Sequence, residues 1–270
     1  MTAAVMSETT AALAVETRSL RRTFGTTVAV DGIDLAVPRG SFYGFLGPNG
    51  AGKSTTIKCL TGLLAPSSGE LRILGLDAKR DEIAIRRVVG VVPEELALFA
   101  RLTGREHLAL VGRLHDLDEA ELVHRSDELL GLFDLTAAAG ASTSDYSHGM
   151  KKKLSLALAL LPAPQLLFLD EPFEGVDAVA SRQMKSLLQA FVHRGGTVFL
   201  TSHVLEIVER LCDHLGVIAG GKLVAQGPVA ELRAGGGTLE QRFLELVGAS
   251  GREIAELDWL GGAAPRAASS

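Results

Sequence analysis

The sequence predicts an α/β protein with a mainly parallel sheet, an antiparallel β subdomain and an inserted α-helical subdomain. Two segments predict the core: a short apolar strand, 41–46, enters a glycine-rich loop, and an apolar run, 166–169, ends in two acidic residues. A strand that is buried on both faces reads as a continuous apolar run, which is typical of a parallel sheet. Between 94 and 144 the apolar residues change to helical spacing, which predicts the insertion.

The composition is that of a globular chain and argues against a nucleic-acid partner. Of 270 residues, 47% are hydrophobic, and the 27 basic and 32 acidic residues leave a net charge of −5. This balance gives no signal for binding a polyanion. The longest apolar candidate, 154–169, is interrupted by polar and proline residues, so we expect no membrane span. Residues 1–13 lack the basic segment of a signal peptide and are expected to form a disordered leader.

The first ordered segments are expected to be paired strands, 15–24 and 28–37, with a turn at 25–27. Phe24 stands out because aromatic residues make up only 5% of the chain. Just before a phosphate-binding loop, an aromatic ring can stack on a purine base. An ordinary core residue at a strand end is an equally good interpretation of Phe24.

The loop that follows matches the template G-x-x-x-x-G-K-[ST] of a P-loop NTPase core. Its residues are Gly47, Pro48, Asn49, Gly50, Ala51, Gly52, Lys53, Ser54 and Thr55. Backbone N–H groups of such a loop and of the expected helix 53–60 can bind phosphate oxygens. Lys53 is expected at the β- and γ-phosphates and Ser54 at Mg²⁺. An ordinary glycine-rich turn is the alternative, but the flanking strand and helix favour a nucleoside triphosphate site.

The middle of the chain is expected to supply two strands, 69–74 and 87–93, and then the helical subdomain, about 95–162. Thr103 and Glu106 have the spacing of a capping box, and Asp118 precedes a second helix. A further helix is expected over 150–161.

The apolar run 166–169 ends in Asp170 and Glu171. Ligands gather at the carboxyl ends of parallel strands. Asp170 is therefore expected to hold Mg²⁺ together with Ser54, and Glu171 to orient or deprotonate the attacking water. Solvated acids in a strand-end turn are the alternative interpretation.

The last third is expected to continue the core. A helix begins at Asp177, and a strand covers 196–200. His203 lies at the carboxyl end of that strand, beside the expected triphosphate site, and is expected to contact the γ-phosphate, while a structural histidine is the alternative. A hairpin over 216–225 is expected to close the fold. The remaining expectations are a glycine hinge at 235–237, an amphipathic helix at 239–247, and a disordered end at 261–270.

Taken in this order, residues 14–247 resemble the ATP-binding subunit of an ABC transporter. The matching motifs are the A-loop aromatic (Phe24), Walker A (47–55), Walker B with its catalytic glutamate (166–171), the D-loop (Asp177) and the switch histidine (His203). The segment Tyr146-Ser147-His148-Gly149-Met150 stands where the family carries Leu-Ser-Gly-Gly-Gln. Exporter-type members are the most similar, through this segment and residues 238–244.

The resemblance implies an ATP-binding domain at 14–234 and a C-terminal extension at 235–270. It implies that two such domains meet head to tail, with ATP and Mg²⁺ between Walker A of one and the signature of the other. Ser147, Gly149 and Asp177 would then act in trans, while Val30 would join the loop 47–55 as a contact in the same chain.

The chain departs from the family pattern at three places. His148 and Met150 change the signature but leave its serine and second glycine, and Glu94 replaces the glutamine of the Q-loop. A carboxylate at 94 can ligate Mg²⁺, but it lacks the amide's donor and adds negative charge. Three lysines, 151–153, follow the signature at a helix start, where cations oppose the helix dipole. A bound anion would favour them there, and solvated lysines are the alternative.

The function that we expect is an ATPase subunit that dimerises on ATP, as a homodimer or with a paralogue. It would work at the cytoplasmic face of the cell membrane and drive a separate transmembrane permease in export. The alternatives are a non-transport ABC ATPase, a nucleotide-dependent module on ribosomes or nucleic acid, and a degenerate subunit with weak hydrolysis because of Glu94.

Overall fold

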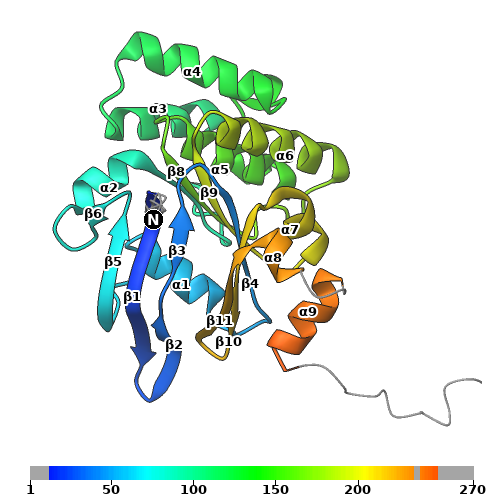
Figure 1. Cartoon of the computed structure of the whole chain (residues 1–270). Coiled ribbons are helices and arrows are strands. Elements are labelled where there is room, and N and C mark those ends of the chain that lie inside the picture. Colours follow the sequence, from blue (N-terminus) through cyan, green and yellow to red (C-terminus); the bar gives the residue numbers. More distant parts are fainter. Residues whose placement is uncertain (1–11, 234–237, 249–270) are drawn as a thin grey trace, which may run out of the picture.

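The computed structural model describes residues 12–233 and 238–248, and a six-stranded sheet lies at its centre (Figure 1). The strand order is β11-β10-β4-β9-β8-β7, and every neighbouring pair is parallel except the hairpin β10–β11. The strands are β4 (Phe42–Leu46), β7 (Val89–Val92), β8 (Leu166–Asp170), β9 (Thr197–Ser202), β10 (His214–Ala219) and β11 (Lys222–Pro228). The predicted parallel core and closing hairpin are confirmed.

Side chains of the central strands alternate between two hydrophobic cores, one on each face of this sheet. In β8, Leu167 and Leu169 belong to one core, and Leu166 and Phe168 belong to the other. All five residues of β8 are buried, as its continuous apolar run predicts. In β9, Phe199 packs its ring at 5.4–5.5 Å from the rings of Tyr43, Phe45 and Phe168.

A second, antiparallel sheet packs over the core that contains Phe168 and Phe199, together with helix α1 (Lys53–Leu60). Its order is β2-β1-β5-β6, with β3 also paired to β1. The strands are β1 (Leu13–Phe24), β2 (Thr27–Ile33), β3 (Ala36–Pro38), β5 (Ser68–Ile73) and β6 (Leu76–Asp77). The predicted antiparallel subdomain is confirmed, but β1 begins at Leu13, one residue inside the expected leader.

The single strand expected over 28–37 is wrong, because the chain leaves the ladder between β2 and β3. The Thr17 hydroxyl donates to the Ile33 carbonyl and accepts from the Leu35 N–H, both at 2.8 Å. The Thr17 N–H donates to the Leu35 carbonyl at 2.9 Å. A buried side chain therefore satisfies the backbone where strand pairing stops.

The helices between β7 and β8 cover the other face of the central sheet (Figure 1). They are α3 (Gly104–Leu114), α4 (Glu119–Leu132) and α5 (His148–Leu160), with 3-10 turns η1 (Thr136–Ala138) and η2 (Thr143–Asp145). The capping box of Thr103 and Glu106 and the cap at Asp118 are confirmed. The expected strand 87–93 is too long, because α2 (Glu82–Val88) occupies its first two residues and β7 ends at Val92, one residue before Pro93.

The remaining helices are α6 (Ala178–His193), α7 (Leu205–Leu211), α8 (Val229–Leu232) and α9 (Leu239–Leu246). Helix α9 starts with a capping box at Thr238 and buries Leu239 against the core, so the predicted C-terminal helix is confirmed. The expected leader up to residue 11, the hinge 235–237 and the end 261–270 lie outside the described residues. Within the described ranges, no helix has the length and apolarity to cross a bilayer.

Candidate functional site

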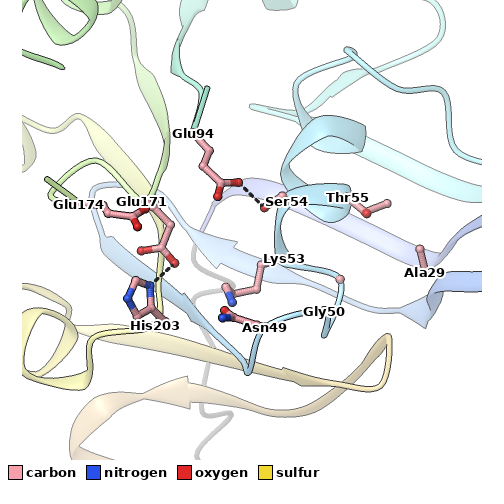
Figure 2. A pocket seen from close by; sticks show the side chains of 11 residues that line it. Ala29, Asn49, Gly50, Lys53, Ser54, Thr55, Glu94, Glu171, Glu174 and His203 are labelled. Carbon is pink, nitrogen blue, oxygen red and sulfur yellow. Dashed lines mark hydrogen bonds and ion pairs between the residues drawn. The ribbon is translucent and has the colours of Figure 1, made fainter. Parts of the chain in front are cut away.

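Five of the side chains predicted to be functional, Lys53, Ser54, Glu94, Glu171 and His203, line one pocket (Figure 2). The parallel register pairs Leu46 at the end of β4 with Ser202 on β9, and Asp170 at the end of β8 with Thr201. The loop 47–52, Glu171 and His203 follow these strand ends directly. Segments more than a hundred residues apart in the sequence are therefore assembled where ligands of parallel sheets bind.

The glycine-rich loop has the tight path that its sequence predicts, and two of its glycines are required by close contacts. A Cβ on Gly47 would lie 2.4 Å from the Ile218 carbonyl oxygen. One on Gly52 would lie 2.5 Å from the Ala29 carbonyl oxygen, and Gly52 also has φ of +108°. No side chain caps the start of α1, which leaves the N–H groups of its first turn directed at the loop. This geometry suits an anion.

Lys53 is almost buried, and its side chain folds over the loop. Nζ donates to the carbonyl oxygens of Gly47 at 2.7 Å and Pro48 at 3.3 Å. These contacts hold the ammonium in the concave side of the loop, where it can exchange a carbonyl for a phosphate oxygen.

Asp170 and Glu171 share one buried threonine. The Thr201 hydroxyl donates to the Asp170 carboxylate and accepts from the Glu171 N–H at 3.1 Å. Burial raises the pKa of Asp170, and the Thr201 hydroxyl opposes that shift. A threonine on a buried strand thus organises both acids of the expected Walker B end.

Glu171 has a backbone φ of +47°, in the left-handed region that a non-glycine residue rarely adopts. Its Oε1 lies 3.1 Å from Nδ1 of His203, so both expected catalytic side chains are in contact (Figure 2). Burial raises the pKa of Glu171, while His203 and Lys53 lower it. A carboxylate with a raised pKa that is held by a neighbouring side chain is suited to accept a proton from water.

Glu94 lies beside the phosphate loop. The Ser54 hydroxyl donates to Oε2 of Glu94 at 3.2 Å (Figure 2). The glutamate that replaces the Q-loop glutamine therefore lies beside Ser54, where Mg²⁺ is expected. The Glu94 side chain is exposed to solvent. The additional charge at 94 therefore belongs to the site.

These groups surround a cavity of about 460 Å³. It is lined by Ala29, Asn49, Gly50, Gly52, Lys53, Ser54, Thr55, Glu94, Glu171, Glu174 and His203 (Figure 2). The volume is in the range of small-molecule and cofactor sites.

The oxygen ligands at this cavity fit Mg²⁺ if phosphate and water oxygens fill its remaining coordination positions. Ser54, Glu94 and Asp170 offer only hard oxygen ligands, which Mg²⁺ prefers. In the described part of the chain, no group of three or more His, Cys, Asp or Glu side chains is placed to hold a metal alone. Mg²⁺ is commonly held by one or two carboxylates together with substrate phosphates and water, which matches this partial set.

None of the five predicted nucleotide contacts outside the phosphate loop lines the cavity in this chain, and Gly47, Pro48 and Ala51 of the loop do not line it either. Val30 is fully buried in the core, because neighbouring side chains of β2 face opposite ways and Ala29 takes the cavity side. Its side chain therefore does not face the cavity in this structure, and its contact with a nucleotide stays a prediction. Phe24 is exposed at the end of β1, with the Arg22 guanidinium 4.5 Å from its ring centroid.

The other three, Ser147, Gly149 and Asp177, lie together on a different part of the surface. Ser147 is exposed and caps α5 by accepting from the Met150 N–H at 3.2 Å. An Asp177 carboxylate oxygen lies within 3.9 Å of the Cβ position of Gly149. The signature and the D-loop of one chain are thus neighbours, and both lie on a surface outside the cavity of that chain.

Sequence reasoning missed Thr201 as an organising residue and Lys152 as a buried one. A threonine two residues before His203, directly after the apolar run 198–200, was the available signal for Thr201. Lys152 is 1% exposed and donates from Nζ to the Glu171 carbonyl oxygen at 3.1 Å, whereas Lys153 lies 4.0 Å from the exposed carboxylate of Asp134. For Lys152, the alternative of a solvated side chain is wrong.

Comparison with known proteins decides the family. A family model described as "ABC transporter" matches residues 30–174 of the chain. The chain belongs to the ABC transporter family. The match begins in β2 and ends just after Glu171, so it includes the phosphate loop, the helical insertion and the paired acids.

Relatives of this ABC cassette extend the match over most of its length. It is 40% identical over 243 residues to the "Daunorubicin/doxorubicin resistance ATP-binding protein DrrA" of Streptomyces peucetius, covering 90% of the cassette and 73% of the relative. It is 39% identical over 218 residues to the "Nod factor export ATP-binding protein I" of Cupriavidus metallidurans, covering 81% and 72%. A solved "ATP binding subunit of ABC transporter" superposes with a TM-score of 0.81 at 31% identity, covering 86% of the cassette and 98% of that chain. The chain is therefore an ATP-binding and ATP-hydrolysing subunit of this family.

Proposed function

We propose that the chain hydrolyses Mg·ATP at the cavity between the phosphate loop and the ends of β8 and β9, and that it drives a separate transmembrane permease in export. The observation that carries the proposal is the contact between Glu171 and His203 beside the phosphate loop, at 3.1 Å. It places a proton acceptor and a polar orienting group next to the site suited to a triphosphate.

Each residue has a role that follows from its position. The N–H groups of the loop and Lys53 bind the phosphates, and Ser54, Asp170 and Glu94 hold Mg²⁺. Bound Mg²⁺ neutralises charge on the β- and γ-phosphate oxygens. Glu171 takes a proton from the attacking water, and His203 holds the Glu171 carboxylate and contacts the γ-phosphate.

Two chains are proposed to assemble head to tail, as a homodimer or with a paralogue. Support comes from Ser147 and Gly149, which lie outside the cavity at the N-terminus of α5, a helix that presents its N–H groups to the surface. In a dimer this surface would close the partner's cavity. Asp177, beside Gly149, would lie in the same interface.

Export through a membrane partner at the cytoplasmic face is supported by the relatives. The two named above are described as a drug-resistance ATP-binding protein and an export ATP-binding protein. Copurification of a membrane protein with this chain would support the permease, and purification from the soluble fraction without one would favour a non-transport ABC ATPase.

The experiment that tests the hydrolytic site is Glu171→Gln. The amide keeps the size of the side chain but cannot accept the proton, so turnover should fall by about 10²-fold or more while ATP affinity stays within a few-fold. Glu128→Gln, on the exposed face of α4, is the matched control and should hydrolyse normally. Hydrolysis by Glu171→Gln at the wild-type rate would remove Glu171 from the mechanism.

A further inference from the structure

Lys152 is a buried cation whose direct partner is a backbone carbonyl. It lies one turn into α5, the helix that Ser147 caps, and it is 1% exposed. Its Nζ donates to the Glu171 carbonyl oxygen at 3.1 Å, across from the end of β8. Among the lysines of the described residues, only Lys152 and Lys53 are buried.

The peptide that Lys152 contacts is in an unfavourable conformation. A non-glycine residue in the left-handed region is strained and persists only where its surroundings impose that conformation. At Glu171 these surroundings act from both ends: the N–H donates to Thr201 on β9, and the carbonyl accepts from Lys152 on α5 and from the Glu174 N–H at 3.3 Å. The backbone that aims the Glu171 side chain is therefore fixed by two side chains.

The burial of Lys152 is costly and needs a reason. An ammonium that leaves water is destabilised unless it is paired, and in the described part of the chain no carboxylate lies within ion-pair distance of its Nζ. Burial accordingly lowers the pKa of Lys152, against the more distant charges of Glu174, Asp170, Glu94 and Glu171. The positive charge of Lys152 also offsets part of the negative charge of the carboxylates around the cavity. Glu94, which stands where the family has a neutral glutamine, adds one of these negative charges.

We propose that Lys152 is a positioning residue for ATP hydrolysis: by holding the Glu171 carbonyl it fixes the turn that presents the Glu171 carboxylate to the cavity. The same helix carries Ser147 at its start, so Lys152 connects the signature surface to the catalytic acid within one chain. The inference rests on the proposed role of Glu171. Lys153, directed at Asp134, has no such contact.

The test compares Lys152→Met with Lys152→Gln in the full chain. Both remove the charge, but only glutamine keeps an N–H donor. Lys152→Met should lower kcat by about 10- to 100-fold, the range that misplacement of a reacting group causes, while the Kd for ATP stays within about threefold. Lys152→Gln should recover part of this loss at a similar melting temperature. Lys153→Met, the same change one residue away, should keep kcat within about twofold of wild type.

Equal kcat for Lys152→Gln and Lys152→Met, or a wild-type kcat for Lys152→Met, would overturn the proposal. If Lys152→Met does not fold, Lys152→Gln and Lys152→Arg replace it, and the proposal then requires arginine, which keeps donor and charge, to retain more kcat than glutamine. Loss of kcat in proportion to a lowered melting temperature in every variant would assign Lys152 to stability alone.

A double variant separates this proposal from the proposed function. If Lys152 acts through Glu171, adding Lys152→Met to Glu171→Gln should cause no further loss in single-turnover hydrolysis. Multiplied losses would show that Lys152 acts elsewhere. Wild-type turnover by Glu171→Gln alone would instead contradict the assignment of the base, and with it the reason for positioning that residue.

Discussion

Nδ1 of His203 lies 3.1 Å from Oε1 of Glu171, and this contact joins the ends of two adjacent parallel strands. The histidine stabilises the ionised form of a carboxylate whose burial favours the neutral form. The pKa of Glu171 is therefore set by two opposing effects, burial and the contact with His203, and each can be changed separately.

Removal of His203 should shift the pH dependence of hydrolysis. Glu171 must be ionised to act, so activity falls as the pH drops through its pKa. Burial raises that pKa and His203 lowers it, hence His203→Ala should raise it further. The acid limb of kcat/KM should move to higher pH, in addition to any loss of rate. An acid limb at the wild-type position would show that His203 does not control the ionisation of Glu171.

Thr201→Val should lower both stability and turnover. The hydroxyl is buried and serves Asp170 and the Glu171 N–H, so its loss leaves buried polar groups unpaired, at a cost of about 1–3 kcal/mol in the free energy of unfolding. Thr197→Val on the same strand is the control, because that hydroxyl accepts from the Gly40 N–H, away from the cavity. Urea unfolding should show destabilisation in both variants, and steady-state kinetics a loss of kcat in Thr201→Val alone. An unchanged kcat in Thr201→Val would make the threonine purely structural.

Activity should require two chains. If Ser147 completes the site of a neighbour, specific activity should rise with protein concentration. A mixture of Ser147→Ala and Lys53→Ala should recover activity, because one of the two sites in each mixed dimer carries neither lesion. Linear activity on dilution, with no recovery on mixing, would indicate a self-sufficient monomer.

The Ser147→Ala variant needs its own control, because it also removes the hydrogen bond that the Met150 N–H donates to Ser147. Loss of such a cap lowers the free energy of unfolding by about 1 kcal/mol. Ser147→Asp keeps a good cap but puts a carboxylate where a phosphate is expected. It should therefore melt like wild type and be at least as inactive as the alanine variant.

Glu94→Gln should change the metal dependence of ATP binding. The carboxylate at 94 attracts Mg²⁺ and repels the triphosphate, so its removal should tighten binding of metal-free ATP more than binding of Mg·ATP. Basal hydrolysis should stay equal or become faster, because the amide restores a donor for water. ATP titrations with and without Mg²⁺ measure the difference, with Glu95→Gln as the neighbouring control. Identical metal dependence would leave Glu94 as a contact to the membrane partner.

Much of the fold was predictable because local signals and burial agree in the central strands. The run 166–169 is buried on both faces, and its two acids stand at the sheet edge as the parallel topology requires. Helix α2 was missed because Ile83, Ile85 and Val88 run on into the apolar residues of β7, and short apolar segments do not reveal their period.

The candidate site was likewise predictable only in part. Glycine, lysine and serine of the loop follow from the motif, and a place for Glu94 near the metal followed from the resemblance to the Q-loop of the family. Lys152 could not be predicted, because its partner is a backbone carbonyl nineteen positions away whose direction depends on the left-handed turn at Glu171. The burial of Val30 could not be predicted, because which side chains of β2 face the core is set by packing against β1.

The place of β9 in the sheet has a consequence for how the protein is made. This strand lies between β4 and β8, yet it leaves the ribosome after both, and Phe199 fills the space among Tyr43, Phe45 and Phe168. Until Ser202 has been synthesised, β4 has no partner in the central sheet and is not joined to the pair β7–β8, so the loop and the paired acids are not yet assembled and the aromatic rings lack their partner Phe199. A nascent chain halted at Gly196 should therefore bind a hydrophobic dye or a chaperone, and full-length release should end that binding.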